Sequence, residues 1–255
     1  MKSNWLIRAG CCVLLFFMAA CATMTDEKSK KESEAYRRVG EAYLQQGKFA
    51  HAMREFNKAE AKNPNDHLLQ YDMGFLYLRK EQYDEALVRF KKALELKPDY
   101  GEAINSMGNA YAGKGEWDQA IFYYKKVVGD ILYGTPHFAY SGLGNAYYYK
   151  GDLEQSEKYY LEALQLKPDF VTALQGLAQT YIKMGRIPEA VEKLEKAVRT
   201  APDSPAVHFQ LAGAYQLALE FKKSYNSYRK VVDLAPDSPL AEEAEQEASK
   251  VKALF

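Results

Sequence analysis

The feature that most constrains this chain is a pattern that recurs six times along it. A large apolar residue followed by glycine or alanine returns at intervals of 34, 34, 36, 34 and 34 residues. The six pairs are Val39-Gly40, Met73-Gly74, Met107-Gly108, Leu143-Gly144, Leu177-Ala178 and Leu211-Ala212. A chain with this period is expected to fold as an array in which each unit buries its apolar face only against its neighbours.

Other residue types keep the same register. When the repeats are counted from residues 33, 67, 101, 137, 171 and 205, the pair takes positions seven and eight. Position eleven is always tyrosine, position twenty is alanine or serine, and position twenty-four is large. Small residues at positions eight and twenty let two helices approach closely, and the large residues fill the space between hairpins.

The turn between the two helices of a repeat shows one variation. Glycine stands there in four repeats, at Gly47, Gly115, Gly151 and Gly185, as a left-handed helix C-cap requires. Glu81 and Leu219 replace it in the second and sixth repeats. We therefore expect those two turns to be strained or differently shaped.

This pattern resembles the tetratricopeptide repeat, which implies an all-α, right-handed superhelical solenoid. The predicted repeats are residues 33–66, 67–100, 101–136, 137–170, 171–204 and 205–238. Ser238-Pro239 has the form of a helix start, with an N-cap serine and proline at the first helical position. Residues 239–255 are therefore predicted to form a capping helix.

The N-terminus is typical of a targeting segment. Lys2 and Arg8 precede an apolar run that ends in Phe17-Met18-Ala19-Ala20-Cys21. This ending resembles a bacterial lipobox, which implies removal of residues 1–20, lipidation of Cys21 and sorting to the outer membrane, facing the periplasm. An ordinary secretory signal or an uncleaved anchor is the alternative. Residues 21–32 are polar, and we predict that they form a flexible tether.

The sequence lacks the residues and motifs that several classes of chemistry require. The formal net charge is zero, which argues against nucleic acid as a partner. Cys11 and Cys12 belong to the predicted leader, and the four histidines fall in different repeats. No zinc-protease, nucleophile-elbow or phosphate-loop motif occurs. We predict a binding protein rather than an enzyme, with no cofactor and no metal.

In tetratricopeptide-repeat proteins, positions two, five, six, nine, twelve and thirteen of the first helix line a concave surface. Aromatic, aliphatic and amide residues at these positions suit a protein partner, because amides pair with both groups of a peptide backbone. The candidates are Tyr71, Phe75, Leu78, Asn105, Asn109, Phe138, Asn145, Tyr148, Tyr149 and Gln179. The alternative is that these side chains pack against one another.

The same positions lack the basic clamp with which some cochaperones grip an acidic C-terminus. Arg37 is present, but Glu41 stands where that clamp has asparagine, and Glu102 and Ser106 stand where it has lysine and arginine.

The third repeat is two residues longer than the others and ends Asp130-Ile131-Leu132-Tyr133-Gly134-Thr135-Pro136. This segment resembles the one before the fourth repeat in the PilF/PilW pilotin family of type IV pilus biogenesis lipoproteins. The resemblance implies a factor that binds secretin subunits and helps them assemble in the outer membrane. The alternative is a lipoprotein scaffold for polysaccharide export, barrel assembly or cell-wall synthesis.

Overall fold

The computed structural model describes residues 26–129 and 133–255. The predicted leader, Cys21 and Asp130-Ile131-Leu132 lie outside the described residues. Every helix named below belongs to the described part, and each predicted repeat holds two of them.

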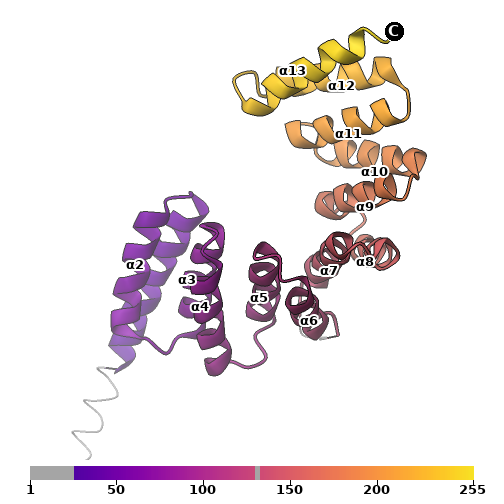
Figure 1. Ribbon diagram of the computed structural model, residues 1–255. Helices are drawn as coiled ribbons and strands as arrows, with labels where there is room; N and C mark the ends of the chain where they lie inside the picture. Colours follow the sequence, from indigo (N-terminus) through magenta and orange to yellow (C-terminus); the bar gives the residue numbers. More distant parts are fainter. Residues whose placement is uncertain (1–25, 130–132) are drawn as a thin grey trace, which may run out of the picture. The chain divides into compact units, whose positions relative to one another are not determined.

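The helices alternate with short turns and loops along the chain (Figure 1). After a first helix over residues 26–45 they are α2 Phe49–Lys62, α3 His67–Arg79, α4 Tyr83–Leu96, α5 Gly101–Gly113, α6 Trp117–Val128, α7 Pro136–Lys150, α8 Leu153–Leu166, α9 Val171–Lys183, α10 Ile187–Thr200, α11 Pro205–Leu217, α12 Phe221–Leu234 and α13 Pro239–Lys252.

One boundary differs from the sequence prediction. We expected a flexible tether through Glu32, but residues 26–32 are already part of the first helix. Ion pairs between residues four apart, Asp26 with Lys30 at 2.6 Å and Glu27 with Lys31 at 2.7 Å, support this turn. The tether prediction is therefore wrong for residues 26–32, because a polar segment without an apolar stripe still continues a helix that is anchored further along.

Close packing within each hairpin explains the small residues. A β-carbon added at Gly74 would lie 2.6 Å from the Phe90 ring, and one at Gly144 would lie 2.8 Å from the Tyr160 ring. The residue at position twenty is fully buried in every repeat. Where that residue is Ser156, its hydroxyl donates to the Gly144 carbonyl at 2.9 Å, so the serine also ties the two helices together.

The six turns have one backbone shape. Gly185 adopts φ 78°, and Glu81 and Leu219 adopt φ 59° and 60° at the corresponding place. The same two backbone hydrogen bonds close the turn at all three residues. The glycine replacements therefore leave the shape of the turn unchanged and place a residue with a β-carbon in the left-handed region, which is strained.

The chain forms two compact units, and the boundary falls inside α5. Unit 1 contains the described residues up to Ser106, and its core gathers around Phe56, Leu69 and Met73. Unit 2 contains the described residues from Met107, with cores around Leu177 and around Tyr228.

The last helix closes unit 2. The Ser238 hydroxyl accepts a hydrogen bond from the Ala241 amide at 3.1 Å, and Pro239 occupies the first turn of α13. Ala244, Ala248 and Val251 of α13 pack against α12, and Glu242, Glu243 and Glu245 are exposed. Helix α13 thus has one apolar face and one polar face.

Candidate partner-binding surface

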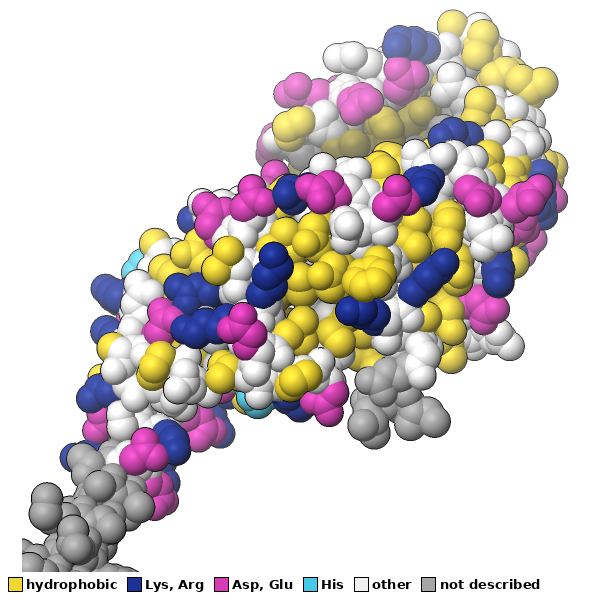
Figure 2. Space-filling model, turned by 60° about the horizontal axis from the view of Figure 1, so that its bottom comes forward, with side chains coloured by type: hydrophobic (Ala, Val, Ile, Leu, Met, Phe, Trp, Pro, Cys, Tyr) yellow, Lys and Arg dark blue, Asp and Glu magenta, His cyan; other side chains and the backbone are white. Residues whose placement is uncertain are grey.

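The first helix of each repeat carries the candidate residues. We call the residues at repeat positions two, five, six, nine, twelve and thirteen the recognition face. In Figure 2 hydrophobic side chains lie at the surface in several places, with lysine and arginine side chains between them. The recognition face is described separately for each unit.

In unit 1, Tyr71 and Phe75 lie on successive turns of α3. Their rings stack with 6.3 Å between centroids. Tyr71 also contacts the rings of Phe90, at 5.8 Å, and Tyr100, at 5.2 Å. Tyr71 thus packs on Phe90, which is fully buried, and burial raises the pKa of the Tyr71 phenol. Phe75 is partly buried against the core and keeps some exposure.

Beside these rings lies an ionic cluster of unit 1. The Arg37 guanidinium donates to Asp72 at 3.0 Å and to Glu41, and its Nε lies 3.8 Å from Asp66. Both Arg37 and Asp72 have 12% of their side-chain surface exposed. Burial, together with the neighbouring Glu41, raises the pKa of Asp72 to about 7 in spite of the Arg37 hydrogen bond.

Leu78 and Asn105 are the remaining candidate residues of unit 1. Leu78 is partly buried. Asn105 is 9% exposed, and its carbonyl oxygen has no hydrogen-bond partner within the described part of the chain.

In unit 2 the recognition face carries amides. Asn109 is exposed and accepts a hydrogen bond from the Tyr124 hydroxyl at 2.8 Å. Asn145 is partly buried and Gln179 is exposed. Between the fifth and sixth repeats, the Gln175 amide donates to Gln210 at 2.9 Å.

The aromatic candidates of unit 2 form two groups. Phe138 is 47% exposed, and its ring lies 4.4 Å from His137 and 5.2 Å from Phe170. At the other end of α7, Tyr148 packs edge-on against Tyr149, and the Lys183 ammonium lies 4.5 Å from the Tyr148 ring.

Tyr149 is 59% exposed and stacks on Trp117 with 4.6 Å between ring centroids. Trp117 lines a shallow hollow together with Asp118 and Lys150, which form an ion pair. Sequence reasoning missed Trp117, since it belongs to the second helix of its repeat and only hairpin packing brings it to Tyr149.

Sequence reasoning also missed the roles of Asp66 and Asp72. It noted Arg37 and Glu41 only as a failed basic clamp. A usable signal was present, since Asp72 is a charged residue within the otherwise uncharged stretch of α3 from Leu68 to Leu78. Burial of a charge is costly unless it is paired.

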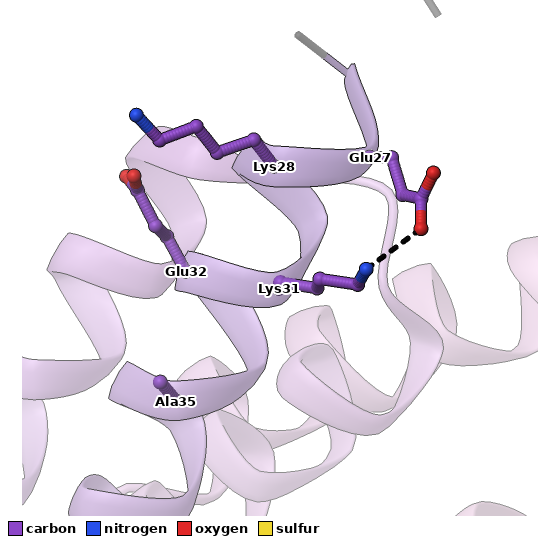
Figure 3. A pocket seen from close by; sticks show the side chains of 5 residues that line it. All are labelled: Glu27, Lys28, Lys31, Glu32 and Ala35. Atoms are coloured by element: carbon purple, nitrogen blue, oxygen red, sulfur yellow. Dashed lines mark ion pairs between the residues drawn. The ribbon is translucent and has the colours of Figure 1, made fainter. Parts of the chain in front are cut away.

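Other features of the described residues suggest no site. A second hollow lies over the first helix, and Figure 3 shows that the side chains lining it, Glu27, Lys28, Lys31, Glu32 and Ala35, all come from that one helix. In residues 26–129 and 133–255, no three His, Cys, Asp or Glu side chains are grouped as a metal site requires. None of the helices in those ranges is both long and apolar enough to cross a membrane.

Matches to known protein families agree with the observed series of paired helices. Profiles described as tetratricopeptide repeat match residues 33–66, 103–134 and 147–214, and one described as TPR repeat matches residues 76–115. The chain is a tetratricopeptide-repeat protein. This observation confirms the predicted all-α fold class, and it identifies a kind of protein that mediates protein–protein interactions.

Solved structures extend the likeness over most of the chain. PilW, described as a widely conserved type IV pilus biogenesis factor, is 20% identical with a TM-score of 0.75, over 83% of this chain and 97% of PilW. PilF of Pseudomonas aeruginosa is 16% identical with a TM-score of 0.71, over 86% of this chain and 99% of PilF. The predicted resemblance to these two proteins is confirmed at the level of structure.

A protein from a different assembly has a similar fold. The Cut9–Hcn1 complex of APC/C contains a chain that is 17% identical with a TM-score of 0.73, and the match covers 85% of this chain and 42% of that one. At this identity a structural match establishes the fold alone. A comparison with curated proteins finds no match.

Proposed function

We propose that this protein is a membrane-anchored scaffold of the bacterial cell envelope, and that it acts as a pilotin-type assembly factor for the outer-membrane secretin of a type IV pilus system. One observation carries the proposal: the chain matches PilW and PilF over 97% and 99% of their own lengths. The Cut9 match covers only 42% of its chain. The two matches also extend over 83% and 86% of this chain, with TM-scores of 0.75 and 0.71. This extent over both chains favours the two pilus proteins as functional relatives.

The recognition faces support a protein partner. Phe138 and Tyr149 expose about half of their surface in unit 2, and Phe75 stays partly exposed in unit 1. Exposed aromatic side chains on a rigid scaffold are typical anchors of protein interfaces. The tetratricopeptide-repeat profiles also support binding as the activity.

The membrane anchor is part of the proposal and rests on Cys21. Cys21→Ser should block lipidation and leave a precursor that the lipoprotein peptidase does not cut. Mass spectrometry of protein extracted from membranes measures this directly. A wild-type N-terminus at Ala22 without lipid, or an intact leader, would contradict the anchor.

The secretin partner is tested by deletion and rescue. A strain without this protein should lose most secretin multimers from its outer membrane, and the wild-type gene should restore them. Tagged wild-type protein should retain secretin from detergent-solubilised membranes. Normal multimers in the deletion strain would overturn the pilotin role.

The alternative is a scaffold for polysaccharide export, barrel assembly or cell-wall synthesis. Neighbouring genes distinguish the two proposals: pilus genes support the first, and polysaccharide genes the second.

A further inference from the structure

The ionic cluster of unit 1 has more negative than positive groups. Glu41, Asp66 and Asp72 all face the single guanidinium of Arg37. Only 12% and 18% of the Asp72 and Asp66 side chains are exposed, whereas Glu41 has 35% exposed. The cluster is therefore mostly shielded from water and open at Glu41.

The other cations near the cluster have contacts of their own. Arg38 pairs with Glu34 on the same helix at 2.5 Å. Arg79 lies over the Phe49 ring at 5.9 Å, and Lys97 lies over the Tyr100 ring at 5.2 Å. Glu102 adds a further carboxylate near Tyr71 and Tyr100. The recognition-face positions of unit 1 hold four carboxylates against three guanidinium groups: Glu34, Glu41, Asp72 and Glu102 against Arg37, Arg38 and Arg79. Negative charge is therefore in excess beside the aromatic rings.

Charge and aromatic surface lie on the same side of α3. Asp72 and Phe75 are three residues apart on this helix and so are neighbours on its surface. Tyr71 packs behind Phe75 and holds it in place through stacking. A side chain that reaches Glu41 and Asp72 therefore lies next to the face of an aromatic ring, which itself attracts cations.

We propose that this recognition face receives a lysine or arginine side chain of the partner, which pairs with Glu41 and Asp72 while an adjacent apolar residue of the partner packs on Phe75. This inference rests on the proposed function, because it names the chemistry of the segment that the scaffold binds. Electrostatic complementarity of this kind selects a partner and its register. The proposal also fits the missing basic clamp, since the charge of this surface is the opposite of the one that grips an acidic tail.

Two synthetic probes test the proposal on the intact protein without its partner. One is the blocked peptide Gly-Phe-Lys-Phe-Gly, and the other has glutamate in place of lysine. Chemical-shift mapping should show saturable changes at Glu41, Asp72 and Phe75 with the lysine peptide, and about tenfold weaker binding of the glutamate peptide.

A matched pair of variants locates the effect. Glu41→Gln removes the exposed carboxylate of the cluster and should weaken the lysine peptide about fivefold to tenfold. Glu27→Gln lies on the same helix, outside both the cluster and the recognition face, and should bind as the wild type does. Raising the salt concentration from about 0.05 M to about 0.5 M should weaken binding to the wild type and much less to Glu41→Gln.

Three outcomes overturn the inference: equal binding of both peptides, shifts that map outside this surface, or wild-type affinity of Glu41→Gln. These outcomes are separable from failure of the proposed function. A chain that prefers the lysine peptide but retains no secretin keeps the inference and loses the pilotin role. A chain that retains secretin but binds both peptides equally keeps the pilotin role and loses the inference.

Discussion

The two units of this protein use one repeat geometry with different chemistry. In unit 1, Arg37 at position five of its repeat donates to Asp72 at position six of the next, over 3.0 Å. In unit 2, Gln175 and Gln210 occupy the corresponding positions and form a hydrogen bond of 2.9 Å. The two contacts span the same number of residues, 35. The backbone therefore brings these two repeat positions together in both units. The side chains at the two positions determine whether the surface there is charged or neutral.

This difference extends over both recognition faces. Positions five, six and nine in the first two repeats include Arg37, Arg38, Glu41 and Asp72. The same positions within unit 2 hold no charged residue, and amides such as Asn145 and Gln179 take their place. A charged surface selects partners by sign, whereas an amide surface suits the backbone of any extended segment. We infer that unit 1 contributes most of the specificity.

The largest expected effect tests whether the units are separate cooperative blocks. Phe56 is fully buried in the core of unit 1, so Phe56→Ala should cost about 3–5 kcal/mol of folding free energy. Stacked repeats couple chiefly to their neighbours. Hydrogen exchange should therefore accelerate across unit 1 and least around α12 and α13. Equal loosening of α13 would mean that the two units unfold as one.

Binding distinguishes the two recognition faces next. Phe75→Ala should weaken the complex with the partner by about 1–3 kcal/mol, or roughly tenfold to a hundredfold, as truncation of an interface anchor does. Tyr149→Ala in unit 2 is the matched aromatic truncation and should cost less. A titration with the partner, accompanied by a melting curve for each variant, measures both effects. A larger loss of binding free energy for Tyr149→Ala would show that unit 2 contributes more to binding than unit 1.

The charge of unit 1 predicts a pH effect. The pKa of Asp72 is raised from 3.8 to about 7, so the folded protein holds a proton there that the unfolded chain has lost. The stability that this proton contributes is complete below pH 3.8 and disappears as the pH rises through about 7.

Asp72→Asn resembles the protonated form at every pH. Its stability relative to the wild type should therefore improve between about pH 5 and pH 8, by roughly 1–3 kcal/mol. Thermal melts of the two proteins across this range measure the difference, and contributions of other carboxylates cancel because both proteins contain them. A constant difference would show that Asp72 is ionised throughout. Gln175→Ala in unit 2 should show no such dependence.

The smallest effect concerns the strained turns, one in each unit. Glu81→Gly and Leu219→Gly should each stabilise the fold by about 0.5–1 kcal/mol, because relief of the left-handed strain exceeds the added freedom of the unfolded chain. Gly185→Ala is the reverse control, since its φ is 78° and no other atom lies within 4 Å of an added β-carbon. Denaturant melts resolve these shifts. Destabilisation by either glycine would mean that the side chains of Glu81 and Leu219 make favourable contacts in the turn.

The sequence by itself determined the hairpins, their number, the turns and the final helix. Glycine and alanine at position eight, tyrosine at position eleven and Ser238-Pro239 act through sterics and hydrogen bonds within a few residues, so their register can be read from the chain alone. The same local reasoning went wrong at residues 26–32, where a polar segment continues a helix.

Only the tertiary structure decided which side chains meet across hairpins. Arg37 meets Asp72, and Trp117 stacks on Tyr149, because hairpin packing brings residues that are 35 and 32 positions apart to contact distance. Tyr71 lies at a recognition-face position, yet it packs on the core residue Phe90. The pKa of Asp72 likewise depends on burial and on Glu41 from another helix, which no spacing along α3 contains. The physical reason is that sequence periodicity specifies the face of a helix, while the partner of that face and its distance from water follow from how the hairpins pack.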